Sequence, residues 1–255
     1  MLLAVATDTL AICTFGAIGL ALIAWVVIRL RRGLFTPVQA LFFMLIYLLV
    51  RLLWRAELPG RLPVDRGQGA IIVCNHRSPA DPAFIAATTG RLVHWMVARE
   101  FATHWLFGRI LGIAEVISTN RGGIDTASTK QAIRLAAEGD LVGIFPEGRI
   151  NISDAVLMPG RPGAAMIALR ARVPIVPCYI EGAPYDGTPV GCLLMKAKVR
   201  LQYGEPIDIS EYYGRERERE VLEEITRRLL AEIAKLAGCH DFQPQLAGRS
   251  YKPAE

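Results

Sequence analysis

The sequence lacks the cysteine spacing of disulfide frameworks and of metal-binding knuckles. Its cysteines are odd in number and scattered along the chain, and no two form a Cys-x-x-Cys pair: Cys13, Cys74, Cys178, Cys192 and Cys239. Such a set indicates a reduced, cytosol-facing protein without disulfide bonds and without a metal site. Internal repeats are absent as well, which excludes solenoid architectures.

Acidic residues are missing from residues 29–55, where five arginines stand: Arg29, Arg31, Arg32, Arg51 and Arg55. The whole chain has 29 Lys and Arg against 24 Asp and Glu, a net charge of +5, so the remainder is close to balanced. A basic front end suits attraction to anionic lipid better than a nucleic-acid footprint, which would spread over a domain. We therefore predict a membrane-lipid partner and no nucleic-acid partner.

Hydrophobic residues make up 52% of the chain and are concentrated at its front. The stretch from Thr9 to Leu30 is almost wholly apolar, and about 20 apolar residues are enough to cross the hydrocarbon core. No basic residues precede it, which disfavours a cleaved signal peptide. The arginines that follow it predict a transmembrane helix whose N-terminus lies outside and whose carboxyl end faces the cytoplasm.

A second apolar stretch runs from Val38 to Trp54, but Arg51 leaves a clean run of only 13 residues, Val38 to Val50. That length favours a re-entrant or interfacial helix with Trp54 and Arg55 at the headgroups. The alternative is a complete second crossing with Arg51 snorkelling, which would carry the rest of the chain to the other side. The first interpretation places the main domain on the cytoplasmic face of the inner membrane.

Beyond Leu58-Pro59-Gly60 the pattern changes to short apolar strands alternating with helices, which predicts an α/β domain with a mixed central sheet covered by helices. We expect a membrane anchor over 1–57, this domain over 58–240 and a disordered tail over 241–255. The expected strands are Ala70–Cys74, Val93–Val97, Ala114–Ser118, Leu141–Phe145, Ile175–Ile180 and Val199–Tyr203. The expected helices are Pro82–Thr89, Glu100–Phe107, Thr126–Glu138, Gly163–Ala171 and an amphipathic Arg217–Leu236.

A histidine and a carboxylate follow the first expected strand, as His76 and Asp81 in Asn75-His76-Arg77-Ser78-Pro79-Ala80-Asp81. If the chain turns at Ser78-Pro79, Asp81 can hold one ring nitrogen while the other acts as a general base. An ordinary strand-end histidine followed by a helix-capping aspartate would give the same spacing. The pair therefore needs support from other parts of the chain.

Three further stretches carry chemistry. Arg121, Gly122 and Gly123 follow the third expected strand, where glycines let the backbone approach a ligand and arginine suits phosphate. Phe145-Pro146-Glu147-Gly148-Arg149 follows the fourth strand, at the sheet edge where open α/β sheets bind ligands. Val173-Pro174-Ile175-Val176-Pro177 has two prolines at the start of a strand.

Together these four stretches resemble the glycerolipid acyltransferase family, best known from the 1-acylglycerol-3-phosphate (lysophosphatidate) acyltransferases. Its first block, N-H-x-S-x-x-D, is matched by Asn75, His76, Ser78 and Asp81. Its second block ends in an arginine, matched by Arg121. Its third reads F-P-E-G-T-R-S and its fourth V-P-I-V-P, matched from Phe145 and from Val173. The resemblance covers roughly residues 58–210.

The resemblance implies acyl transfer from acyl-CoA or acyl-carrier protein to the free hydroxyl of a lysophospholipid in phospholipid synthesis, without a cofactor. It implies that His76 and Asp81 are catalytic, and that Arg121, Glu147 and Arg149 position the polar head of the acceptor. Seven residues are expected to bind substrate: Asn75, Ser78, Arg121, Gly122, Glu147, Gly148 and Arg149. The threonine of the third block is missing, so Arg149 stands one place early.

Two alternatives accompany this prediction. The acceptor could be glycerol 3-phosphate, a lyso-aminolipid or another lysophospholipid. A non-catalytic membrane lipid-binding protein is disfavoured, because a binding protein has no need of a histidine base with an orienting carboxylate.

Overall fold

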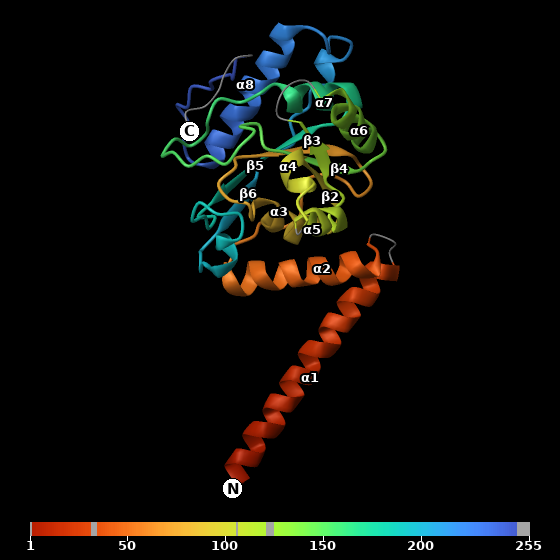
Figure 1. The fold of residues 1–255 in the computed structure, drawn as a ribbon, viewed down its shortest axis with the longest axis vertical. Helices are drawn as coiled ribbons and strands as arrows, with labels where there is room; N and C mark the ends of the chain where they lie inside the picture. Colours follow the sequence, from red (N-terminus) through yellow and green to blue (C-terminus); the bar gives the residue numbers. More distant parts are fainter. Residues whose placement is uncertain (1, 32–34, 106, 121–124, 249–255) are drawn as a thin grey trace.

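The computed structural model describes residues 2–31, 35–105, 107–120 and 125–248. Helix α1, Leu2–Arg31, extends away from the rest of the molecule (Figure 1). It contains the whole of the predicted helix from Thr9 to Leu30. Among the described residues, however, no helix combines the length and apolar character needed to cross a membrane. The transmembrane character of this segment thus stays a prediction.

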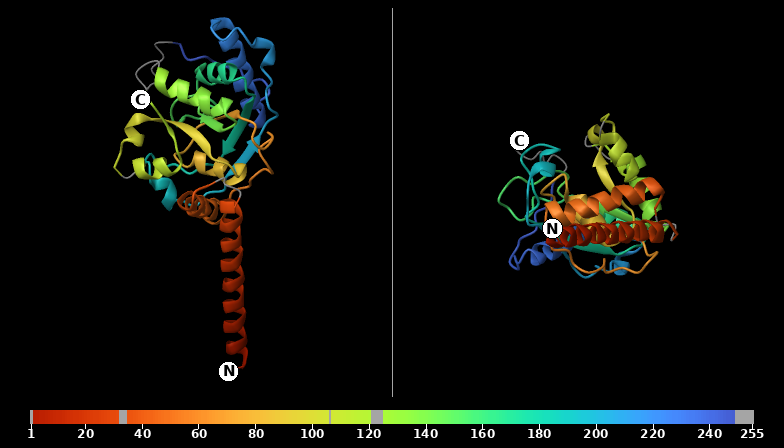
Figure 2. Two further views of the ribbon diagram at one scale, coloured as in Figure 1. Left: turned by 90° about the vertical axis from the view of Figure 1, so that its right-hand side faces the viewer. Right: turned by 90° about the horizontal axis from the view of Figure 1, so that it is seen from below.

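Helix α2, Pro37–Leu48, lies across the lower side of the domain and continues as a short π-helix, η1, Leu49–Leu53 (Figures 1 and 2). Thr36 and Gln39 form a capping box at its start, and Pro37 occupies its first turn. The Gln39 side chain also donates to the carbonyl of Ile113 and to the carboxylate of Glu115. One face of α2 is thereby fastened to the domain, which disfavours a separate crossing of a bilayer.

Trp54, expected at the headgroups, is buried instead, with only 2% of its surface exposed. Its indole Nε1 donates to the carbonyl of Cys192 at 3.0 Å, and its ring meets Phe84 edge-on at 5.2 Å between centroids. The π-helix and the turn that follows it point the indole into the domain. Arg55, the next residue, is exposed as expected.

Six strands form one sheet in the order β3-β2-β4-β1-β5-β6. All neighbours are parallel except β5 and β6, so the sheet is mixed, as predicted. The strands are β1 Ala70–Cys74, β2 Val93–Ala98, β3 Ile117–Thr119, β4 Leu141–Ile144, β5 Ile175–Glu181 and β6 Arg200–Tyr203. The remaining helices are α3 Asp81–Thr89, α4 Arg99–Ala102, α5 Phe107–Ile113, α6 Thr126–Ala137, α7 Gly163–Ala171 and α8 Arg219–Leu236, with 3₁₀ turns η2 Gly191–Leu194 and η3 Ser210–Tyr212.

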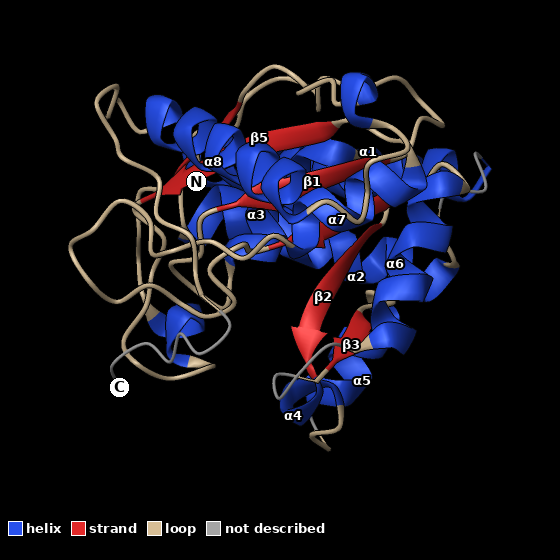
Figure 3. Cartoon of the chain, turned by 90° about the horizontal axis from the view of Figure 1, so that it is seen from above, coloured by secondary structure: helices blue, strands red, loops and turns tan. Residues whose placement is uncertain are grey.

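Each face of the sheet has its own hydrophobic core, because side chains alternate along a strand. In β1, Ile71 and Val73 join the core that contains α6, α7 and α8, whereas Ile72 joins the core that contains Phe84 of α3 and Trp54. Figure 3 shows the helices on both sides of the strands. All five residues of β1 are buried, which explains why the strand reads as a continuous apolar run.

Two predicted elements differ from the structure. The single helix expected at Glu100–Phe107 is divided into α4 and α5, with residues 103–105 between them. The third strand begins at Ile117 rather than Ala114, because Glu115 adopts a left-handed backbone, φ 49°, that no strand continues through.

The chain also stays folded past Asp241, where the sequence predicts a disordered tail. Gly160 donates to the carbonyl of Gln245, and Ala247 donates to the carbonyl of Gly160, both at 2.9 Å. Residues 249–255 lie outside the described part of the chain.

Candidate active site

The site forms where β1 and β4 end side by side. Val73 and Ile144 are paired in the parallel register, so the residues after each strand leave the sheet together. His76 stands two residues beyond β1, and Phe145 to Glu147 follow β4 directly. The order of the strands thereby joins the first and third sequence blocks, which lie about seventy residues apart. Carboxyl ends of neighbouring parallel strands are the usual ligand-binding edge of such sheets.

His76 and Asp81 are in hydrogen-bond contact, with 2.9 Å between Nδ1 and Oδ2. The His76 side chain is 16% exposed, and that of Asp81 is fully buried. A carboxylate bonded to Nδ1 fixes the ring orientation and favours the tautomer with its proton on Nδ1. Nε2 is then the ring nitrogen that can accept a proton from a substrate.

The turn between the two residues holds the carboxylate in place. Asp81 Oδ2 also accepts hydrogen bonds from the backbone N–H groups of Arg77 at 2.7 Å and Ser78 at 2.8 Å. Asp81 is the first residue of α3, so its charge lies at the helix end that favours an anion. Its other oxygen, Oδ1, is buried and has no hydrogen-bond partner. Such a desolvated carboxylate is costly to bury, and the bonds to Oδ2 offset part of that cost.

One face of the His76 ring is stacked on an aromatic side chain. Its ring lies parallel to that of Phe145, with centroids 3.8 Å apart and an angle of 8°, and Phe145 stacks in turn on Trp95 at 4.5 Å. Gly143 makes room for this stack, because a Cβ at that position would lie 2.5 Å from atoms of the Trp95 ring. The stack leaves the histidine little rotational freedom, so its orientation is set before any substrate binds.

Glu147 is buried beside the histidine and accepts two backbone hydrogen bonds. Oε1 accepts from the N–H of His76 and Oε2 from the N–H of Met158, each at 2.9 Å. Burial raises the pKa of the Glu147 carboxyl, although these two bonds act in the opposite direction. The structure therefore assigns Glu147 to fixing the backbone of His76, where the sequence predicted contact with the acceptor.

Replacing this carboxyl tests its pH behaviour. Because the folded pKa of Glu147 is raised above its unfolded value, its stabilising contribution is complete below that unfolded value and decreases as the pH rises through the folded pKa. In Glu147→Gln the amide nitrogen cannot accept one of the two bonds, which should cost about 1–3 kcal/mol of unfolding free energy. We expect the loss of melting temperature relative to wild type to be largest near pH 4 and to shrink toward pH 7. Thermal melts of both proteins across this range measure it, and a loss that grows with pH would contradict the assignment.

Asn75 and Ser78, predicted to bind substrate, are fully buried and bonded to the main chain. The Asn75 amide exchanges two hydrogen bonds with the backbone of Ile180, at 2.8 and 2.9 Å, and so continues the pairing of β1 with β5. The Ser78 hydroxyl donates to the carbonyl of Pro184 and accepts from the N–H of Ala80. Both side chains hold the His76–Asp81 turn against its neighbours, and their contact with substrate stays a prediction.

Arg77, which the sequence did not single out, fastens the shortened third block to this turn. Its guanidinium donates to the carbonyls of Asn151 at 3.0 Å and of Ser153 and Ala155 at 2.6 Å. The N–H of Asn151 donates in turn to the carbonyl of His76 at 2.7 Å. The loop that lacks the threonine thus packs directly against the His76–Asp81 turn.

The remaining predicted residues lie at the turn after β4 or outside the described chain. Gly148 is exposed and has a positive φ of 72°, which only glycine adopts without strain. Arg149 is half-buried. Arg161, a residue not predicted, lies against this turn, with Nε 3.6 Å from the place of a Cβ on Gly148. Arg121 and Gly122 lie outside the described residues.

This arrangement suits proton removal from a bound hydroxyl. It supplies a histidine with one ring nitrogen available as a base, a carboxylate that orients the ring, and an exposed turn with an arginine nearby. The hydroxyl of Ser78, in the same turn, is buried and bonded to the backbone of Pro184 and Ala80. In the described part of the chain, no group of three or more His, Cys, Asp or Glu side chains is placed to hold a metal ion.

Comparison with known proteins agrees with this chemistry. A family model described as acyltransferase matches residues 55–181. The chain is 31% identical over 175 residues to the 1-acyl-sn-glycerol-3-phosphate acyltransferase of Bacillus subtilis, covering 66% of this chain and 82% of that one. It is 27% identical over 146 residues to the enzyme of that name from Limnanthes alba, covering 56% and 52%. The chain thus spans about half the length of this plant relative.

The fold has a solved counterpart. The crystal structure of the 1-acyl-sn-glycerophosphate (LPA) acyltransferase PlsC from Thermotoga maritima superposes with a TM-score of 0.59 over 79% of this chain and 80% of that one, at 19% identity. The family model, the Bacillus relative and this shared fold concern the same α/β domain. The chain therefore belongs to the acyltransferase family that includes the 1-acyl-sn-glycerol-3-phosphate acyltransferases, and it is an O-acyltransferase.

Proposed function

We propose that the protein transfers a fatty acyl group from acyl-CoA or acyl-carrier protein to the free hydroxyl of 1-acylglycerol 3-phosphate. The observation that carries this proposal is the hydrogen bond between His76 Nδ1 and the buried Asp81, which leaves Nε2 as the base. The names of the relatives favour lysophosphatidate over the other acceptors, glycerol 3-phosphate and lyso-aminolipids.

In this mechanism His76 Nε2 takes the proton from the acceptor hydroxyl as its oxygen attacks the thioester carbon. The new ester C–O bond forms, the C–S bond breaks, and the proton passes from His76 to the leaving thiolate. Asp81 stabilises the imidazolium in between, as the carboxylate of a catalytic triad does. Because the acceptor attacks the thioester directly, this mechanism needs no acyl-enzyme intermediate.

An assay of thiol release tests the reaction. Purified protein with acyl-CoA and lysophosphatidate should release free CoA and form phosphatidate, and a panel with glycerol 3-phosphate and other lysophospholipids should rank below lysophosphatidate. Repeating the panel with acyl-carrier protein identifies the donor. Tight lipid binding without thiol release from either donor would indicate a binding protein and overturn the proposal.

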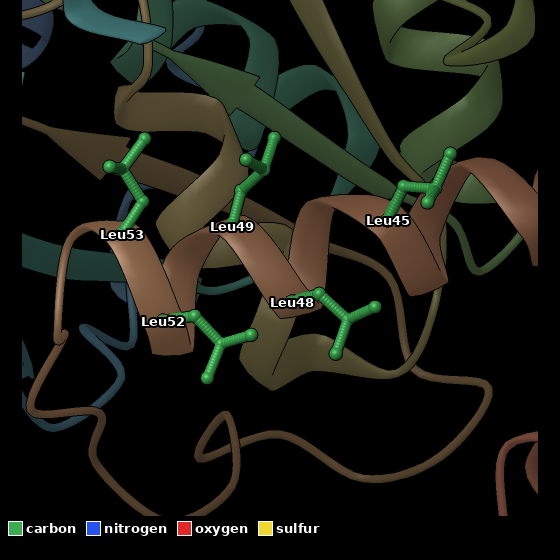
Figure 4. A pocket seen from close by; sticks show the side chains of 5 residues that line it. All are labelled: Leu45, Leu48, Leu49, Leu52 and Leu53. Atoms are coloured by element: carbon green, nitrogen blue, oxygen red, sulfur yellow. The ribbon is translucent and has the colours of Figure 1, made fainter. Parts of the chain in front are cut away.

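We also propose that the apolar front end holds the catalytic domain at the cytoplasmic face of the inner membrane, where the acceptor resides. Large apolar side chains are exposed along α1, among them Phe15, Leu20 and Ile23. Leucines of α2 and η1 line an open groove of about 350 Å³, and Leu52 is 73% exposed: Leu45, Leu48, Leu49, Leu52 and Leu53 (Figure 4). Exposed apolar surface of this extent is typical of a contact with membrane or protein.

The two arginines of the phosphate site should differ in their contribution. Arg121 matches the second block of the family and is followed by two glycines in the sequence, whereas Arg149 stands one residue early. A guanidinium binds phosphate through directional paired bonds, so a shift of one residue can turn it away from its ligand. We expect Arg121→Ala to raise the acceptor KM more than Arg149→Ala does, and this larger effect should correspond to a loss of about 1.5–3 kcal/mol of binding free energy. KM measured with lysophosphatidate and with a neutral lysolipid checks this, since the effect should shrink for the neutral acceptor.

The KM of Arg161→Ala should be compared with that of Arg149→Ala, because Arg161 lies against the turn at Gly148. Arg121→Lys should recover part of the loss. Equal KM penalties for Arg121→Ala and Arg149→Ala would show that the displaced arginine still reaches the phosphate.

A further inference from the structure

The 3₁₀ turn η2 and the residue before it expose apolar side chains that belong to neither hydrophobic core. Leu194 is 88% exposed, and Leu193 and Val190 are about half exposed, although Cys192 between them is buried. Three adjacent aliphatic side chains at the end of a loop are more than the scattered single exposures of an ordinary surface. We refer to Val190, Leu193 and Leu194 as the η2 tip.

The loop that carries the η2 tip is held in shape by its own hydrogen bonds. Asp186 accepts from both the N–H and the hydroxyl of Thr188, at 2.9 and 2.8 Å. That hydroxyl accepts in turn from the N–H of Gly191 at 2.9 Å. A Cβ at residue 191 would overlap the Asp186 carboxylate, so the carboxylate occupies the space that Gly191 leaves open. The leucines are therefore presented on a preformed support, so little ordering is needed when they contact a partner.

The η2 tip is also fixed relative to α2 and η1. The Trp54 indole, directly after η1, donates to the carbonyl of Cys192. The chain that leaves the tip returns to the same place, since the N–H of Val199 donates to the carbonyl of Trp54 at 3.3 Å. Figures 1 and 2 show the teal segment around η2 at the lower edge of the domain, beside the end of α2 and η1. The exposed leucines of η1 and those of η2 thus lie on the same side of the molecule.

Exposed basic residues follow the η2 tip along the chain, and one acidic residue, Asp186, lies in its loop. Lys196, Lys198 and Arg200 follow it and are exposed, and Arg55 is exposed after η1. Glu57 pairs with Lys198 at 3.2 Å, and the other three cations have no such carboxylate partner among the ion pairs of the described residues. An apolar tip followed by several exposed lysine and arginine residues fits the boundary between acyl chains and anionic headgroups.

We infer that the η2 tip inserts into the surface of an anionic bilayer as a second contact beside α2 and η1, and so fixes the orientation of the catalytic domain on the membrane. This inference rests on the proposed membrane association of the front end. It goes beyond it by assigning a lipid contact to a loop more than a hundred residues away in the sequence. Two separated contacts on one rigid domain determine its tilt, which a single helix leaves free.

A fluorophore on residue 194 tests this inference without reference to turnover. Leu194→Cys in a Cys13→Ser, Cys239→Ser background leaves the other native cysteines buried. Labelled with an environment-sensitive dye, the full chain should shift to shorter emission wavelengths on vesicles of phosphatidylcholine and phosphatidylglycerol, and nitroxide lipids should quench it. Arg227→Cys, on an exposed position of α8, is the control and should show neither change.

A second measurement uses the variant Leu193→Asp/Leu194→Asp. Its KM for acceptor in anionic vesicles should rise about tenfold, equivalent to about 1.4 kcal/mol, while its turnover of a short-chain, water-soluble acceptor stays unchanged. Unchanged emission at residue 194 in protein that sediments with the vesicles would overturn the inference. A shift that depends on protein concentration without vesicles would overturn it in favour of self-association. An inactive protein whose label still reports insertion would refute only the acyltransferase proposal.

Discussion

Replacing His76 by alanine is expected to lower turnover by about 10²-fold or more, the scale on which a general base contributes. The imidazole is partly exposed at the end of β1, whereas its partner Asp81 is fully buried and out of reach of an acceptor hydroxyl. Without the imidazole, the acceptor hydroxyl would have to transfer its proton to water. The kcat for acyl transfer to lysophosphatidate, measured with saturating donor, gives the size of the effect.

Two controls separate catalysis from structure in this variant. His76 contributes its backbone N–H to Glu147 and its carbonyl to Asn151, and alanine retains both. The ring also covers Phe145, so a modest loss of melting temperature is expected. Phe145→Leu removes the same stacking contact but keeps the base, and it should lower turnover far less. A purified His76→Ala protein that works within about threefold of wild type would exclude this histidine as the base.

The sequence was sufficient to predict the central strands β1 and β4, because they are buried on both faces and read as short apolar runs. It also indicated the His76–Asp81 pair, whose five-residue separation is closed by one turn at Ser78-Pro79. Both features depend on local patterns. The division of the helix expected at Glu100–Phe107 was missed, because nothing between Thr103 and Trp105 is a strong helix breaker.

The partners of the buried polar groups were not predictable in the same way. Asn75 bonds to Ile180 and Arg77 to Ser153, contacts that depend on the strand order β4-β1-β5 rather than on nearby residues. From sequence alone, a polar residue beside a catalytic histidine is equally consistent with binding substrate or holding the backbone. Gly143 was the one signal available for the aromatic stack, since an isolated glycine within a strand indicates a close approach by another group.

The Asp81→Asn variant should lose turnover on a scale similar to His76→Ala, about 10²-fold or more, while remaining folded. The amide has nearly the shape of the carboxylate, and its oxygen can keep the bonds that Oδ2 accepts from the N–H groups of Arg77 and Ser78. It carries no charge, however, so it cannot stabilise the imidazolium that forms when His76 takes the proton. The defect should therefore appear in kcat rather than in KM.

The stability of this variant is a second, independent readout. With the amide oxygen at the Oδ2 position, the nitrogen of the introduced amide occupies the place of Oδ1, which is buried without a hydrogen-bond partner. An unsatisfied buried donor costs about 1–3 kcal/mol, so a lower melting temperature is expected. Asp81→Ala should be less stable still, because it leaves two backbone N–H groups without their acceptor. If Asp81→Asn melts lower as expected but keeps wild-type kcat, then the stack on Phe145 alone orients His76, and the carboxylate serves the fold rather than the reaction.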